Sequence, residues 1–194
     1  MDESVRAAMA KWPDVPGLYG WISLDEAGHW RLKGEPITHA GLIEFINRNY
    51  ECDEQGRWFF QNGPQRGYVD LAYTPWILHV DNAGQLRTHT GATVDSLQSA
   101  WVDDDGNLLL ETPLGIGLVG TSSLATVAEW LVDASDQPLD ADRVQALVTD
   151  LADGRAGELR LHAPGGESLP VGFIERAAVA QHFGFVATPR GEDN

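Results

Sequence analysis

One turn signal, Asp-x-x-Gly, constrains the fold of this chain more than any other feature of its sequence. Four of its occurrences, at residues 25–28, 53–56, 81–84 and 103–106, are flanked by runs of apolar or aromatic residues. Aspartate and glycine favour tight turns for different physical reasons, the first through its side-chain acceptor and the second through its backbone freedom. The pattern therefore predicts hairpins of antiparallel β-strands along the first 120 residues.

The turn signals form two parallel series, which predicts an internal repeat. Asp81 follows Asp25 by 56 residues, and Asp103 follows Asp53 by 50. Residues 57–60, Arg-Trp-Phe-Phe, correspond to residues 107–110, Asn-Leu-Leu-Leu. The shorter second spacing indicates that a helix of the first unit is shortened or lost in the second. We expect one unit over residues 1–75, a second over 76–188, and a frayed tail over 189–194.

Helical spacing of apolar residues predicts helices between and after the hairpins. Thr38 is the expected N-cap of one helix, Thr121 or Ser122 of another, and Asp140 of a third. A last hairpin is expected over residues 158–173. The predicted helices cover residues 4–12, 38–50, 121–132, 140–154 and 177–183. The sum is an α+β fold of antiparallel hairpins with a few packing helices.

Composition limits the classes of partner. The formal charge of −16, from 29 acidic and 13 basic residues, opposes binding to nucleic acid or to an anionic membrane. No apolar run has the length of a membrane span or of a signal peptide. The single cysteine, Cys52, cannot form an internal disulfide, which fits a reducing compartment. We therefore expect a cytoplasmic protein.

The second hairpin of the first unit carries the best candidate ligand site. Arg66 can present its guanidinium fork to a phosphate or carboxylate, with Gln65 and Asn62 orienting the ligand. Trp58 or Tyr68 would stack on it. The alternative is structural: a turn at residues 62–64, with Arg66 in an ion pair with Asp70, Glu44 or another acid.

The other sequence motifs do not indicate a cofactor-binding site or a metal site. Residues 115–120 match G-x-G-x-x-G, but Pro113 interrupts the strand before them, and a hairpin return strand explains them better than a dinucleotide site. The six histidines lack metal-ligand spacing. We expect no cofactor and no metal, and no catalytic residue can be assigned.

Three segments carry a resemblance to known families: residues 19–25, 30–39 and 58–66. They resemble a bacterial family of uncharacterised proteins, a domain of unknown function, over residues 12–185. A second family of unknown function is more distantly similar. That resemblance implies a duplicated α+β fold whose second half is similar to a partial pleckstrin-homology barrel. It also implies a ligand site between the halves, for a nucleotide-like molecule in signalling.

These observations favour a non-catalytic protein that binds a small anionic or nucleotide-like ligand, or a regulatory protein, with its site between the two repeat units. One alternative is a hydrolase-type enzyme that uses His39 or His79 with a carboxylate. Another is an assembly protein, such as a homodimer, that pairs through exposed hairpin edges.

Overall fold

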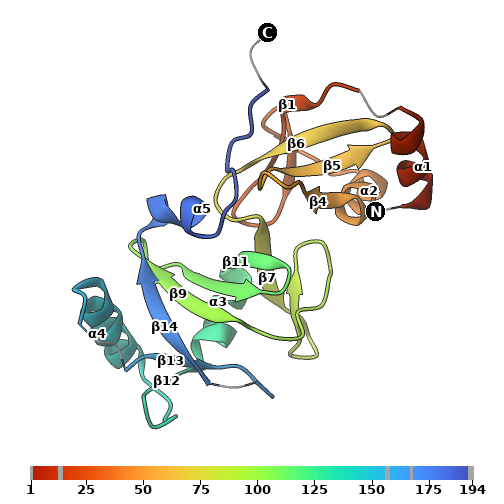
Figure 1. Ribbon diagram of the computed structural model, residues 1–194. Coiled ribbons are helices and arrows are strands. Elements are labelled where there is room, and N and C mark those ends of the chain that lie inside the picture. The colour runs from red at the N-terminus through yellow and green to blue at the C-terminus, as the bar shows by residue number, and fades with distance from the viewer. Residues whose placement is uncertain (1, 13–14, 156–157, 167, 192–194) are drawn as a thin grey trace. The chain divides into compact units, whose positions relative to one another are not determined.

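The computed structural model describes residues 2–12, 15–155, 158–166 and 168–191. Its contacts divide the chain into two compact units: Met1–Pro75 with Ala180–Asn194, and Trp76–Val179. Each unit is built on its own β-sheet, so the predicted α+β class is confirmed (Figure 1). None of the described helices is long and apolar enough to cross a membrane.

The first unit is a six-stranded sheet in the order β3-β2-β1-β6-β5-β4. Neighbouring strands are antiparallel, except that β1 runs parallel to β6. The parallel pair joins the two predicted hairpins into one sheet, which the turn signals alone could not show. The elements are α1 (Glu3–Lys11), β1 (Leu18–Leu24), β2 (Trp30–Leu32), β3 (Glu35–Pro36), α2 (Ala40–Arg48), β4 (Tyr50–Cys52), β5 (Trp58–Asn62) and β6 (Gln65–Leu71).

An aromatic cluster forms the core beneath α2. Tyr50 meets the ring of Trp30 edge-on at 5.0 Å and that of Trp58 at 4.9 Å. The indole N–H of Trp30 donates to Asn47 Oδ1 (2.7 Å), which ties α2 to the sheet. The cap of α2 differs from the prediction: His39, not Thr38, is the N-cap, and its Nδ1 accepts from the Leu42 N–H at 3.2 Å.

The second unit is an eight-stranded sheet in the order β12-β13-β14-β9-β10-β11-β7-β8. Helix α3 packs against β7 and β11, and α4 lies alongside β14 (Figure 1). The predicted cap of α4 is found, since Asp140 accepts from the Arg143 N–H; α3 begins after Gly120, without a side-chain cap. The elements are β7 (Trp76–Val80), β8 (Leu86–Thr88), β9 (Ser99–Asp103), β10 (Leu108–Thr112), β11 (Gly115–Val119), α3 (Thr121–Ala128), β12 (Leu131–Val132), α4 (Ala141–Ala152), β13 (Arg160–His162), β14 (Ser168–Ile174), a 3-10 turn (Arg176–Ala178) and α5 (Val179–His182).

The two sheets share a strand order. In the first unit β2-β1-β6-β5-β4 are neighbours, and in the second β8-β7-β11-β10-β9 are neighbours. In each series, the strand that comes first in the chain pairs in parallel with the strand that comes last in the chain: β1 with β6, and β7 with β11. In place of α2, the second unit has an irregular segment between β8 and β9.

The C-terminal segment packs differently from the expectation. Residues 180–188 were expected in the second unit, but the contacts group them with the first. The Val186 N–H donates to the Gly56 carbonyl, and the Leu71 N–H donates to Ala187, both at 2.8 Å. Within the expected frayed tail, Pro189 is buried and Arg190 pairs with Asp70 at 2.8 Å. Residues 192–194 of that tail lie outside the described residues.

Candidate functional site

The five residues of the predicted ligand site do not share one face of the sheet. In the register of β5 and β6, Gln61 faces Arg66 and Asn62 faces Gln65. Because successive side chains of a strand point to opposite faces, Arg66 and Tyr68 lie on one face. Trp58, Asn62 and Gln65 lie on the other.

Neither aromatic residue of that group presents a free ring. Tyr68 is stacked on Tyr19 with centroids 4.6 Å apart and planes 6° apart, and the Arg57 guanidinium lies over the Tyr68 ring at 4.7 Å. Tyr68 is only 4% exposed, so its ring is not open to a ligand. Trp58 is buried against Tyr50. The expected stacking by Trp58 or Tyr68 is therefore absent from this geometry.

The structure reveals an ion pair beside Tyr68 that the sequence interpretation missed. Asp53 Oδ2 accepts from Arg57 Nε at 2.8 Å and from the Tyr68 hydroxyl at 3.2 Å. Burial raises the pKa of Asp53, but hydrogen bonds from Arg57 and Gln55 outweigh it, so the pKa lies below its usual value. The four-residue spacing of Asp53 and Arg57 across the turn was the available signal.

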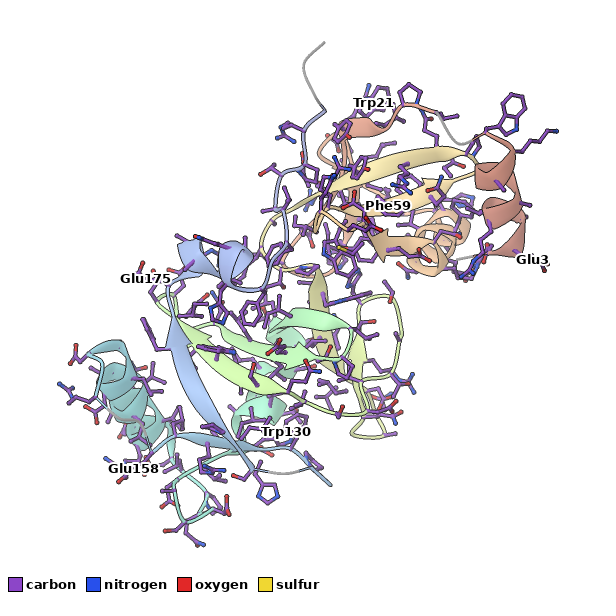
Figure 2. The ribbon with its side chains drawn as sticks, in the orientation of Figure 1. Glu3, Trp21, Phe59, Trp130, Glu158 and Glu175 are labelled. Atoms are coloured by element: carbon purple, nitrogen blue, oxygen red, sulfur yellow. The ribbon has the colours of Figure 1, made fainter. Side chains whose placement is uncertain are left out.

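Arg66 differs from the arginines that pair with turn aspartates. Its guanidinium lies over the Phe59 ring at 4.6 Å, and no described carboxylate pairs with it (Figure 2 labels Phe59). Its two expected partners are engaged elsewhere, Asp70 with Arg190 and Glu44 with Arg48. Arg66 is thus a half-buried cation without a counter-charge among the residues that the structure describes.

Two of the three side-chain amides near Arg66, those of Gln61 and Gln65, donate to backbone carbonyls. Gln65 Nε2 donates to the Pro16 carbonyl at 3.4 Å, and Asn62 is exposed. Across the strand pair, Gln61 is fully buried and donates to the Gly63 carbonyl at 3.0 Å. Its Oε1 has no donor among the described residues. An ordered water is the ordinary partner for such a buried acceptor.

The second unit contains a pocket of about 610 Å³. The turn between β7 and β8 forms one wall, the segment between β8 and β9 another, and the turn between β13 and β14 a third. The lining residues are 83–86, 94–97, Trp130, 163–166 and Leu169. Trp130, which Figure 2 labels, lies between α3 and β12.

The residues that line this pocket also indicate that the sheet of the second unit is curved. Strands β7 and β8 stand at one end of the strand order, and β13 and β14 stand near the other. Loops from both ends line one pocket, so the sheet must curl strongly within the unit. The sequence interpretation missed the pocket because its walls come from segments far apart in the chain.

The histidines occupy separate places. His39 caps α2, whereas His79 lies in β7 with its Nδ1 3.4 Å from Ser122 Oγ. Among the described residues, no group of three or more His, Cys, Asp or Glu side chains is placed to hold a metal ion.

A family model described as "Protein of unknown function (DUF2946)" matches residues 1–190. No curated protein gives a significant match. Among solved structures, a DUF1285 family protein from Silicibacter pomeroyi DSS-3 is 14% identical with a TM-score of 0.47, over 68% of this chain and 85% of that one. A DUF1285 family protein from Shewanella baltica OS155 is 15% identical with a TM-score of 0.41, over 55% and 89% of the two chains. On the family match, this chain belongs to the family of proteins of unknown function that the DUF2944 model describes.

Proposed function

We propose that this protein binds a small ligand, without catalysis, in the pocket of the second unit. The observation that carries the proposal is the pocket of about 610 Å³, which lies within the range of roughly 300–1,000 Å³ typical of small-molecule sites. Its walls combine apolar side chains, such as Leu86 and Leu169, with a few polar groups. That composition buries a ligand and orients it. The exposed single cysteine fits a cytoplasmic setting.

A pocket-filling variant tests this proposal against a matched control. Ala83 and Ala27 occupy the third position of equivalent turns, and the N–H of each donates to the turn aspartate, at 2.9 Å and 3.1 Å. Both are exposed, but only Ala83 lines the pocket. Ala83→Trp should abolish the thermal shifts produced by hits from a metabolite screen, and Ala27→Trp should leave them unchanged. Equal shifts in both variants would place the ligand elsewhere.

A second candidate is the expected binding of an anionic or nucleotide-like molecule at Arg66. What favours it is the half-buried guanidinium without a carboxylate partner among the described residues. Arg66→Ala should remove any thermal shift caused by phosphorylated metabolites. Arg6→Ala is the control, since Arg6 is an exposed arginine of the same unit. An unchanged shift in Arg66→Ala would refute this site.

The enzyme alternative has less geometric support. His39 Nδ1 already accepts from a backbone N–H at the start of α2, which opposes a role as a general base through that atom. Self-association through sheet edges, as in a homodimer, stays a prediction. The edges are β3 and β4 in the first sheet and β12 and β8 in the second. Light scattering that shows a strict monomer would exclude it.

A further inference from the structure

We infer that the pocket of the second unit selects an organic cation with an apolar body. This inference rests on the proposed function, because it names the ligand class of the same pocket. Among the described lining residues, Asp95 carries the only formal charge. Its carboxylate has no ion pair or hydrogen bond to another described residue.

The two basic residues closest to the pocket in sequence are hydrogen-bonded to other residues, and neither of them lines the pocket. Arg87 follows the lining residue Gln85 and donates to its Oε1 at 2.9 Å, but its Nε also pairs with Asp81 Oδ2 at 2.6 Å. Arg160 lies in β13, outside the lining, where its Nε donates to Ser168 Oγ at 2.8 Å and one of its terminal nitrogens donates to the Ser168 carbonyl at 2.6 Å. Among the described lining residues, the charge that a ligand meets is therefore the negative one of the exposed Asp95.

The remaining walls suit the body of such a ligand. Trp130 is half-buried, and the face of an indole ring attracts a cation. Leu86, Val94 and Leu97 supply an apolar surface beside it. The formal charge of −16 adds a long-range field that draws cations towards the protein and repels anions.

Three probes that share an apolar body and differ in charge test the inference: phenylbutylamine, phenylbutanol and phenylbutyrate. Isothermal titration calorimetry on the full chain should rank the amine first and the acid last. Asp95→Asn should weaken amine binding about fivefold, the effect of one partly solvated charge pair, and leave alcohol binding unchanged. Asp142→Asn, a change of an exposed carboxylate at the start of α4, is the control and should alter neither.

The outcomes separate this inference from the proposed function. If the alcohol or the acid binds as tightly as the amine, the cation preference is wrong while the pocket remains a binding site. If Asp95→Asn and Asp142→Asn weaken the amine equally, the effect is that of net charge, and the inference fails. If none of the three probes binds, the inference also fails, and the Ala83→Trp screen then decides whether the pocket binds any ligand.

Discussion

Single aspartate side chains close the turns that define this fold. In the turn at Asp53, the N–H groups two and four residues later donate to Oδ1, both at 3.0 Å. The turns at Asp25, Asp81 and Asp103 repeat these two hydrogen bonds. A fifth such turn begins at Asp133, and the sequence pattern missed it because an aspartate with a positive φ stands at its glycine position.

His89 should make the free energy of unfolding depend on pH in a range that lies above the pKa values of the carboxylates. Burial, with a smaller effect of His79, lowers its pKa from 6.5 to about 3, and its Nδ1 accepts from the Ile77 N–H at 3.3 Å. The unfolded chain therefore binds a proton that the folded protein does not. Stability should fall as pH drops below about 6.5, by about 1.4 kcal/mol per pH unit while only this group titrates.

Thermal unfolding between about pH 7 and pH 4.5 measures this slope, because the lowered pKa values of Asp25, Asp53 and Asp81 act at lower pH. The variant His89→Gln should lose the slope in that range. A variant as pH-sensitive as the natural chain would show that another group is responsible.

At the scale of elements, the turns predicted which strands form hairpins but not how the hairpins join. Strands β1 and β6 pair in parallel although α2 and four strands separate them in the chain. Alternation of faces within β5 and β6 then separates Trp58 from Arg66, which sequence proximity had grouped. Register, rather than distance along the chain, decides which side chains can form one site.

Two glycines at equivalent turn positions should respond differently to substitution. Gly56 and Gly106 have φ of 75° and 80°, so alanine is strained at either position and should cost about 1 kcal/mol. A Cβ at Gly56 would also collide with the Gly184 carbonyl oxygen, whereas none of the described atoms lies within 4 Å of a Cβ at Gly106.

Gly56→Ala should therefore destabilise the protein by roughly 2 kcal/mol more than Gly106→Ala, in line with other changes that overpack a well-packed region. Urea unfolding followed by circular dichroism compares the two. Similar midpoints for the two variants would mean that the C-terminal segment does not press on the Gly56 turn in solution.

At the scale of the whole molecule, the chain completes the second unit before it returns to the first. Residues 76–179 are contiguous, whereas the first unit uses both ends of the chain. The returning segment buries Phe185 and hydrogen-bonds to both Gly56 and Leu71. The two units should therefore differ in whether a single stretch of sequence can fold.

Separate fragments test this difference. Residues 76–179 alone should give a dispersed amide spectrum by NMR, since the stretch contains a complete sheet and its helices. Residues 1–75 alone should be poorly folded and should gain structure when a peptide of residues 180–194 is added. A fully folded 1–75 fragment would contradict the structural role of the returning segment.

The sequence by itself determined the α+β class, the hairpins and the place of α4, because Asp-x-x-Gly turns and the Asp140 cap act within a few residues of each other. It also singled out Arg66 as a candidate ligand contact, since basic residues are scarce in this chain, and that role stays a prediction.

Only the tertiary structure decided which groups meet. Tyr19 stacks on the Tyr68 ring, and the Arg57 guanidinium lies over that ring. Loops from the two ends of one sheet line the pocket beside Trp130. Strand pairing and sheet curvature bring together side chains that are distant along the chain, and no local pattern encodes that distance. The Asp-x-x-Gly turns determine where the chain reverses direction, and long-range packing determines which residues each turn contacts.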